Sequence, residues 1–306
     1  MDLSVKIGKG VLKNPVGVAS GTFGYGQEFA EIMDLSKLGA IYTKAISIEV
    51  RRGNPTPRIV ETPSGMLNSI GLANVGVEKF ITDKIPFLAE LDVATVVNVA
   101  GTTMDDYCNV IKRLDDIDTV WGYEINLSCP NVEAGSIQFG TDPAMVEQVT
   151  AMMRAVTEKP LLVKLSPNVT DIAEIALGAE RGGADGVTCI NTLMGMVIDT
   201  AKQETVIARK TGGLSGPAIR PVGVRMTHQV SRAIGIPVVG IGGITNADDA
   251  IQYLLAGAKA VQVGTWNFVE PASSESISDE IAAYMEDHGI ERIDDFAALL
   301  DRHKDG

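Results

Sequence analysis

Cysteine and histidine are both scarce in this sequence. Its 306 residues include three cysteines, at positions 108, 129 and 189, and no two of them form a C-x-x-C pair. This spacing argues against a disulfide framework, and against an iron–sulfur cluster held by this chain, because such a cluster normally takes four thiolates. The three histidines (228, 288 and 303) follow none of the predicted strands. We therefore expect no metal site and no histidine base.

Long apolar runs and an excess of basic residues are also missing. No apolar run approaches the roughly 20 residues that span a bilayer. The opening MDLSVKIGKGVLKNP lacks the basic-then-apolar layout of a signal peptide. Lys and Arg number 26 against 39 Asp and Glu, which gives a formal net charge of −13. We expect a cytoplasmic protein with neither a membrane nor a nucleic acid as partner, because no basic stripe is available to neutralise phosphates.

The residues that are present have the balance of an ordinary globular protein, with 45% hydrophobic and 21% charged. Short β-branched apolar runs recur along the whole chain. Most are nearly continuous rather than alternating, which is typical of parallel strands covered on both faces. These runs are PVGVAS (15–20), AIYTKA (40–45), ATVVNV (94–99), GYEINLS (122–128), LLVKLS (161–166), DGVTCI (185–190), IPVVGI (236–241) and KAVQVG (259–264).

Helical patterns separate these strands. The segment 142–159 is one example, and 170–184 is another, with a Thr170–Asp171 cap and an end at Gly182. Eight alternating strands and helices predict an α/β fold, a single (β/α)₈ TIM barrel that forms one domain over residues 1–306. Three of the intervals between the starts of successive predicted strands are longer than the rest, which predicts long loops after strands 2, 4 and 6. Loops of this kind lie on the carboxyl face, where barrel active sites are found.

Glycines at the end of the chain indicate a phosphate site. GIGGI (240–244) follows strand 7 and VGT (263–265) follows strand 8. Glycines at these positions let backbone N–H groups approach a phosphate. Glycines can equally serve only to end strands tightly, and many barrels of different chemistry share the feature.

Polar residues gather at the predicted strand ends. Lysines and asparagines are seldom buried without a partner, so a set of them at one rim is difficult to explain by packing. Asparagine offers both a donor and an acceptor, which suits a ring edged with C=O and N–H groups, and lysine complements an anion. The set comprises Lys44, Asn98, Asn126, Lys164 and Asn191, extended by Asn68 and Asn131 in the long loops.

Cys129 differs from the other two cysteines in its position. It lies just after strand 4 in NLSCPN (126–131), whereas Cys108 falls in a helical segment and Cys189 inside strand 6. A cysteine is usually a small buried apolar residue, and we keep that interpretation for Cys108 and Cys189. As a thiolate at the carboxyl face, Cys129 is able to remove a proton from carbon.

Several motifs in order resemble those of dihydroorotate dehydrogenase, and more narrowly the class 1B catalytic subunit. The resemblance covers nearly the whole chain. A cysteine in place of a serine base differs from the quinone-linked class 2 enzymes, and SIQFGTDP (136–143) resembles class 1B more than the fumarate-linked class 1A. The motifs are ASGTFGYG (19–26), NSIGLAN (68–74), NLSCPN, KLSPN (164–168), INT (190–192), GGLSGPAIRP (212–221), GIGGI and VGTWNF (263–268).

The resemblance implies two sets of binding residues. The matching positions for bound FMN are Ser20, Lys44, Ala45, Asn98, Asn126, Lys164, Ile190, Gly216, Gly242, Gly243, Gly264 and Thr265. The matching positions for dihydroorotate or orotate are Lys44, Asn68, Ser69, Ile70, Gly71, Leu72, Asn126, Asn131, Asn191 and Thr192.

The resemblance also implies a reaction and a partner. Cys129 takes a proton from C5 of dihydroorotate, a hydride passes from C6 to the flavin, and Lys164 stabilises the negative charge of the reduced flavin. The reaction belongs to pyrimidine (UMP) biosynthesis, and the electrons reach NAD⁺ through a second subunit that carries FAD and a [2Fe–2S] cluster. A homodimer of barrels within a heterotetramer is expected. No G-x-G-x-x-G follows a predicted strand in this chain.

Other functions remain open from the sequence. A fumarate-linked class 1A enzyme shares most of these motifs. A dihydropyrimidine dehydrogenase-type flavin domain shares the barrel, cysteine and asparagines but acts on a base without a carboxylate. A phosphate-binding barrel without redox function predicts a colourless protein, and a noncatalytic scaffold leaves the polar rim without a role.

Overall fold

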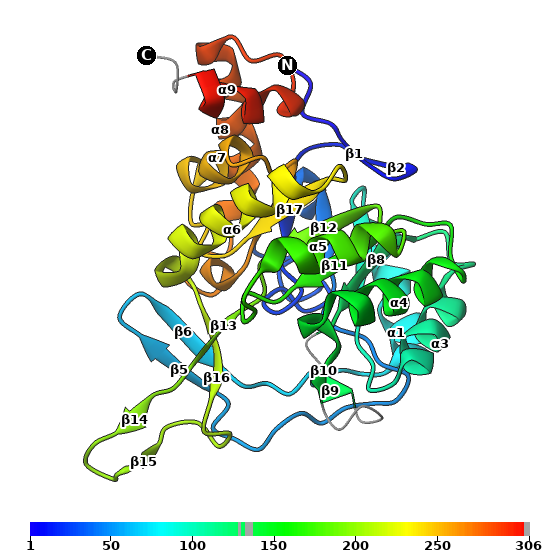
Figure 1. Ribbon diagram of the computed structural model, residues 1–306, viewed down its shortest axis with the longest axis vertical. Coiled ribbons are helices and arrows are strands. Elements are labelled where there is room, and N and C mark those ends of the chain that lie inside the picture. Colours follow the sequence, from blue (N-terminus) through cyan, green and yellow to red (C-terminus); the bar gives the residue numbers. More distant parts are fainter. Residues whose placement is uncertain (128–129, 132–136, 303–306) are drawn as a thin grey trace.

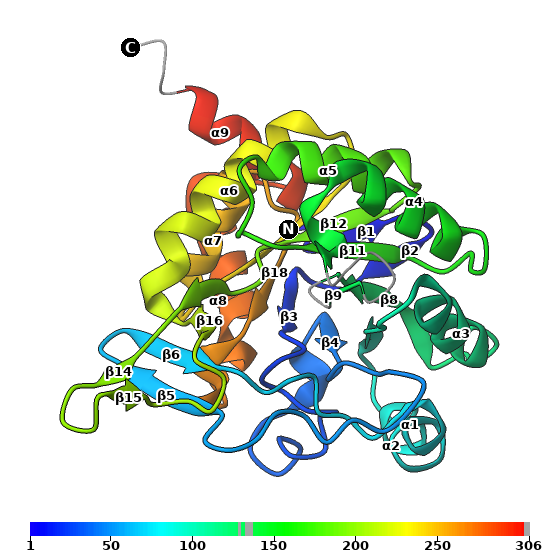
Figure 2. The same cartoon turned by 60° about the horizontal axis from the view of Figure 1, so that its bottom comes forward.

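The computed structural model describes the backbone of residues 1–127, 130–131 and 137–302, and the side chains of residues 1–127 and 139–300. Eight parallel strands close into a barrel at its centre (Figures 1 and 2). Every predicted strand is present, so the predicted α/β barrel is confirmed. The barrel strands are β3 (Val16–Val18), β4 (Ala40–Tyr42), β7 (Ala94–Val99), β8 (Val120–Asn126), β11 (Leu161–Leu165), β12 (Gly186–Cys189), β17 (Val238–Ile241) and β18 (Ala260–Val263).

The order of the strands around the barrel is β11-β12-β17-β18-β3-β4-β7-β8. All five residues of β11 are buried, as the continuous apolar run predicts for a strand covered on both faces. Figure 2 shows helices arranged around this ring. The helices are α1 (Val77–Asp83), α2 (Ile85–Leu88), α3 (Met104–Leu114), α4 (Pro143–Arg154), α5 (Ile172–Arg181), α6 (Arg220–Ala233), α7 (Ala247–Leu255), α8 (Ser273–His288) and α9 (Phe296–Arg302).

Side-chain caps fix the starts of several helices. The predicted start of α5 is confirmed, because the Asp171 side chain accepts a hydrogen bond from the backbone N–H of Ala173, and the helix ends at Gly182. Helix α3 begins with a capping box between Thr103 and Asp106. Its buried face packs into an apolar core that also contains β8 and α4. The caps thus fix where these helices begin, and their buried faces cover the outside of the barrel.

The predicted long connections extend from the carboxyl ends of the strands. Two of them pair with each other and form a four-stranded antiparallel sheet of order β13-β16-β6-β5, which we call the arm (Figure 1, lower left). The arm strands are β5 (Ile59–Thr62), β6 (Gly65–Asn68), β13 (Leu193–Gly195) and β16 (Gly212–Ser215), with the hairpin β14 (Ile198–Asp199) and β15 (Glu204–Thr205) beyond them. The connection after β8 forms the short pair β9 (Pro130–Asn131) and β10 (Ile137–Gln138).

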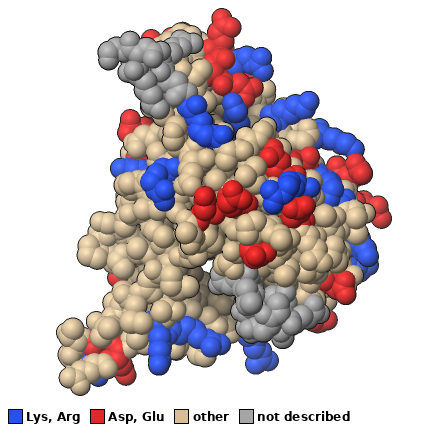
Figure 3. Space-filling model, in the orientation of Figure 1, with Lys and Arg blue, Asp and Glu red and all other residues tan. Residues whose placement is uncertain are grey.

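The arm exposes several large apolar side chains. Ile59, Met194, Met196 and Ile198 are each at least half exposed. Figure 3 shows acidic and basic side chains interspersed over the upper and right parts of one face, and further charged side chains of both signs at the lower left, in the region of the arm. Exposed apolar patches of this kind are typical of contact surfaces.

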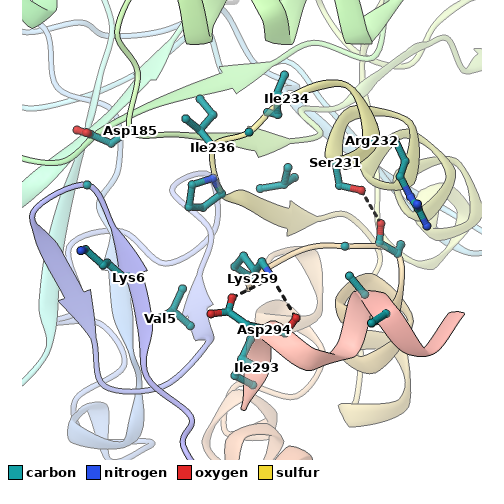
Figure 4. Close-up of a pocket in the computed structure, with 18 of the residues that line it drawn as sticks. Val5, Lys6, Asp185, Ser231, Arg232, Ile234, Ile236, Lys259, Ile293 and Asp294 are labelled. Carbon is teal, nitrogen blue, oxygen red and sulfur yellow. Dashed lines mark hydrogen bonds and ion pairs between the residues drawn. The ribbon is translucent and has the colours of Figure 1, made fainter. Parts of the chain in front are cut away.

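The other end of the barrel carries a groove with a volume of 740 Å³ (Figure 4). It lies between the hairpin of β1 (Val5–Ile7) and β2 (Gly10–Leu12), the connection from α6 to β17, and the C-terminal helix α9. Within it, the ammonium group of Lys259 forms an ion pair with Asp294 at 2.8 Å. None of the residues predicted for the active site lines this groove, which lies at the amino ends of the strands.

Neither a membrane span nor a metal-binding cluster is present in the described part of the chain. None of its helices is both long enough and apolar enough to cross a membrane. Among the same residues, no group of three or more His, Cys, Asp or Glu side chains is placed to hold a metal ion. Cys108 and Cys189 are both buried and free, in α3 and β12 as predicted.

Candidate active site

A polar cluster fills the barrel interior below the carboxyl ends of the strands. Lys164 on β11 is buried, and its ammonium nitrogen lies 3.2 Å from the Glu124 carboxylate and 3.3 Å from the Ser20 hydroxyl. The side-chain amide of Asn98 donates to the same carboxylate oxygen at 2.6 Å. Three of the residues predicted to bind a cofactor (Ser20, Asn98 and Lys164) are therefore brought together around Glu124.

Charge within this cluster is closely balanced. Burial alone raises the pKa of Glu124, but the opposite charge of Lys164 and a hydrogen bond from Gln262 outweigh it and hold that pKa below its usual value. Glu124 is therefore ionised at neutral pH. An ionised carboxylate is stable in a barrel interior only when it is paired and hydrogen-bonded, and Glu124 meets both conditions.

Asparagines follow each other around the mouth of the barrel. Asn126 is the last residue of β8, and its side-chain oxygen accepts a hydrogen bond from the Asn191 amide at 3.3 Å. The backbone carbonyl of Asn126 accepts a bond from the Tyr107 hydroxyl at 2.9 Å, which ties this strand end to α3. Asn191 is itself held, because its backbone N–H donates to the Leu165 carbonyl at 2.8 Å.

The arm brings two further predicted residues to the same mouth. Asn68 at the end of β6 donates to the Gly213 carbonyl at 3.2 Å. A Cβ atom added to Gly213 would lie 2.1 Å from the Thr192 hydroxyl oxygen, so Thr192 packs directly against the arm. The pairing of β16 with both β6 and β13 thus joins Asn68 to Thr192, although 124 positions separate them in the sequence.

Lys44 lies just beyond β4 and is partly buried. Burial lowers its pKa, the carboxylate of Glu28 acts against this shift, and the nearby charge of Arg58 adds to it, so the net direction is downward. The Nε atom of Arg58 is buried and has no hydrogen-bond partner among the described residues. Lys44 and Arg58 thus form a pair of neighbouring basic side chains that suits an anionic group.

The predicted substrate segment 68–72 is fixed by a second loop. The side-chain amide of Asn54 donates to Ser69, and the backbone N–H of Asn54 donates to the Ile70 carbonyl at 3.0 Å. Gly71 and Leu72 have positive φ values of 74° and 55°, and for leucine this conformation is strained. Leu72 packs against Ala45 and Ala100. The segment is thus a rigid edge of the site.

Glycines gather where β16, β17 and β18 end. Gly216, Gly242 and Gly243 all have positive φ, and a Cβ atom on Gly243 would lie 2.8 Å from the Gly216 carbonyl oxygen. The hydroxyl of Thr265 donates to Ser215 at 2.7 Å. A Cβ atom on Gly264 would meet nothing within 4 Å except the Ala19 side chain at 3.6 Å. Beside Gly264, therefore, the protein leaves room close to its backbone.

Three more of the predicted site residues are Ile190, Cys129 and Asn131, and only the first has a described side chain. Ile190 is buried, and its backbone N–H donates to the Ile241 carbonyl at 3.1 Å, which joins the ends of β12 and β17. Cys129 lies outside the described residues. Asn131 is described only in its backbone, where it pairs with Ile137.

The site has the features that a flavin requires. The Oδ1 atom of Asn98 is buried without a hydrogen-bond partner among the described residues, so it is an acceptor that a bound ring N–H would satisfy. Lys164 supplies a buried positive charge that shares the Glu124 carboxylate with Asn98, and the space beside Gly264 leaves room for a phosphate near the end of β18. The residues present therefore fit FMN.

Four polar residues of the site were not predicted from the sequence. Glu28, Arg58 and Glu124 are charged, and Gln262 is a buried neutral group. The signal for Glu124 and Gln262 was available, because each is a polar residue inside an otherwise apolar strand run. Nothing in the sequence around Glu28 or Arg58 distinguishes them from ordinary surface charges.

The fold and the site together define an α/β-barrel protein with a buried lysine and an asparagine-lined mouth. Residues 2–285 match the family model for dihydroorotate dehydrogenase. The chain is 53% identical over 300 residues to the dihydroorotate dehydrogenase B (NAD(+)) catalytic subunit of Pelobacter propionicus, covering 98% of this chain and 99% of that one.

Proteins of the same description from two other organisms are similar to the chain. The identity is 52% for Trichlorobacter lovleyi, covering 98% of both chains, and 49% for Alkaliphilus metalliredigens, covering 98% of this chain and 99% of that one. The chain belongs to the dihydroorotate dehydrogenase family.

Proposed function

We propose that this chain is the FMN-containing catalytic subunit of an NAD⁺-linked dihydroorotate dehydrogenase, which oxidises dihydroorotate to orotate in pyrimidine biosynthesis. The observation that carries the proposal is the buried Lys164–Asn98–Ser20 cluster beneath a mouth lined by asparagines. The name shared by the relatives, which specifies NAD(+), favours this function over a fumarate-linked enzyme or a dihydropyrimidine dehydrogenase-type domain.

FMN, when bound, supplies the acceptor for the two electrons that leave the substrate. Asn98 would accept a hydrogen bond from the ring, and Lys164 would lie where negative charge develops. The phosphate would lie against the backbone at the ends of β16, β17 and β18. The full set proposed for the cofactor is Ser20, Lys44, Ala45, Asn98, Asn126, Lys164, Ile190, Gly216, Gly242, Gly243, Gly264 and Thr265.

Dihydroorotate would be held by groups that match its two sides. The asparagines offer donors and acceptors to the ring, and Lys44 with Arg58 offers positive charge to the carboxylate. The rigid edge 68–72 would close one side. The proposed substrate residues are Lys44, Asn68, Ser69, Ile70, Gly71, Leu72, Asn126, Asn131, Asn191 and Thr192, with Arg58 added.

Cys129 is proposed as the base that takes a proton from C5. It follows Asn126 by three positions, so the described end of β8 leads directly to it. A thiolate is able to abstract a carbon-acid proton, and the fixed asparagines supply the positioning on which such a transfer depends.

The visible spectrum of the purified chain tests the proposal. A yellow protein with a flavin spectrum is expected, and anaerobic dihydroorotate should bleach it, because the substrate delivers two electrons to the flavin. Orotate alone should perturb the spectrum without bleaching. A colourless protein that takes up no FMN would overturn the proposal, and bleaching by dihydrouracil but not by dihydroorotate would favour the dihydropyrimidine alternative.

Gly264→Ala tests the phosphate end of the cofactor site. The added methyl group meets only Ala19 at 3.6 Å, but the φ of −111° and ψ of −107° at Gly264 lie outside the regions that alanine favours, so some stability should be lost. The same methyl group would occupy the room proposed for the phosphate, so FMN affinity should fall by tenfold or more, measured by flavin fluorescence on titration of the apoprotein. The midpoint of urea unfolding of the apoprotein should fall, and the titration is made without urea, where both apoproteins are folded.

Gly235→Ala is the matched control for this change. Its added methyl group meets only the end of the Glu180 side chain at 3.3 Å, in the connection from α6 to β17 at the opposite end of the barrel. It should leave FMN affinity unchanged. Equal affinity of wild type and Gly264→Ala would place the phosphate elsewhere.

The electrons are proposed to leave through a second subunit, which the words "catalytic subunit" in the relatives' name support. We propose that this second subunit carries FAD and a [2Fe–2S] cluster. We propose further that residues 1–306 form one domain, that the barrels pair as a homodimer within a heterotetramer, and that the complex is cytoplasmic. The exposed apolar side chains of the arm supply a candidate contact surface for such an assembly.

A further inference from the structure

Glu124 is the one buried carboxylate in the polar cluster of the barrel, among the residues that the structure describes. Its side chain is fully buried in the middle of β8. Oxygen Oε1 accepts from Lys164 at 3.2 Å and from Asn98 at 2.6 Å, and Oε2 accepts from Gln262 at 2.8 Å. The carboxylate is thus held by donors from three other strands.

The bond to Gln262 crosses the barrel. In the closed order of strands, β18 lies four places from β8 in either direction, so the two strands face each other across the interior. The bond to Asn98 comes from the neighbouring strand β7, where Asn98 and Glu124 are direct partners in register. Two amides, one from the neighbouring strand and one from across the barrel, therefore fix the carboxylate, and the carboxylate in turn fixes the Lys164 ammonium group.

The ion pair between Lys164 and Glu124 affects the charge near the proposed flavin as well as the position of the Lys164 ammonium group. Lys164 alone would present a full positive charge at the flavin, which strongly favours its anionic reduced form. A carboxylate 3.2 Å from the ammonium nitrogen offsets part of that charge. A buried pair of this kind does not by itself imply a gain in stability, so its retention in the interior calls for another role.

We propose that Glu124 is a positioning residue that fixes the Lys164 ammonium group and moderates its charge, and so sets the reduction potential of the bound flavin lower than Lys164 alone would give. This inference rests on the proposed FMN site. Asn98 shares the carboxylate, so the same residue also orients the amide whose Oδ1 remains available to the flavin ring.

The test is the flavin midpoint potential of Glu124→Gln, measured by equilibration with reference dyes. The change keeps the shape and removes the charge. The new amide fits sterically because the Oε1 atom of Gln262 has no partner among the described residues, so rotation of that amide lets it accept from the new amide nitrogen. The loss of the carboxylate leaves Lys164 without its buried partner, so the variant should also lose stability. The potential should become more positive by at least 30 mV, a tenfold gain in affinity for reduced over oxidised flavin in a two-electron couple.

Two further variants make the result specific. Thr95→Val is the control, because Thr95 is fully buried on β7, its hydroxyl has no partner among the described residues, and the change is neutral in charge. Its potential should equal that of the wild type. Glu124→Asp keeps the charge but draws it back from Lys164, so it should shift the potential in the same direction by less.

The outcomes separate this inference from the proposed function. Wild-type protein that binds no FMN overturns the proposed function itself. Wild-type protein with FMN, combined with an unchanged potential in Glu124→Gln, overturns the inference alone and leaves Glu124 a structural ion-pair partner. If Glu124→Gln does not fold, Glu124→Asp decides in its place, and an unchanged potential there has the same meaning.

Discussion

Replacement of Cys129 by serine should slow the anaerobic reduction of the flavin by dihydroorotate roughly 10²–10⁴-fold at neutral pH, the range that general bases contribute. A thiol has an ordinary pKa of about 8.5, whereas a serine hydroxyl is a far weaker acid and is almost never ionised near pH 7. The variant should still bind FMN, because Cys129 is not among the residues proposed to hold it. Stopped-flow absorbance at the flavin band measures the rate.

The pH dependence of the same variant gives a second check. Its rate should rise with pH well beyond the point at which the wild type levels off, since the hydroxyl needs a higher pH to act as a base. Cys108→Ala is the matched control, because Cys108 is a buried cysteine on α3 whose pKa is raised by burial, and its loss should leave the rate unchanged. Flavin reduction at the wild-type rate in Cys129→Ser would remove Cys129 from the mechanism.

The barrel was predictable because its strands obey a local rule. A strand covered on both faces has to be apolar along its whole length, as β11 and β17 are, and such runs are visible without any knowledge of their neighbours. The arm was not predictable in the same way. Its pairing joins 65–68 to 212–215, and glycine-containing strands of four residues carry little alternation to indicate it.

The site residues that were predicted differ from those that were missed in the same respect, namely whether the signal is local in the sequence. Lys44, Asn126 and Asn191 were predicted because a strand end in a barrel always lies at the carboxyl face, whichever strand it belongs to. Glu124 is visible in the sequence as a charged residue inside an apolar strand run, but its partners could not be predicted because they depend on closure of the barrel. A bond between β8 and β18 exists only once eight strands are in order, and 138 positions separate Glu124 from Gln262.

The chain on its own should oxidise dihydroorotate with artificial dyes and should fail to reduce NAD⁺ at a comparable rate. The proposed FMN site explains the first part, since dyes accept electrons from a reduced flavin at the barrel mouth. The second part follows from the cysteines. Cys108 and Cys189 are buried in α3 and β12, which leaves the chain without a described thiolate at its surface to ligate a cluster. Metal analysis should accordingly find no iron.

Addition of a subunit with FAD and a [2Fe–2S] cluster should restore NAD⁺ reduction by tenfold or more, in proportion to the complex formed. The matched control is the same subunit added to Cys129→Ser, which should gain little, because proton removal from the substrate then limits the electrons available. Stopped-flow mixing of the dihydroorotate-reduced chain with the partner separates the two steps, since transfer from flavin to cluster no longer depends on Cys129. Rapid NAD⁺ reduction by the chain alone would refute the two-subunit arrangement, and efficient turnover with fumarate would assign the chain to the fumarate-linked class.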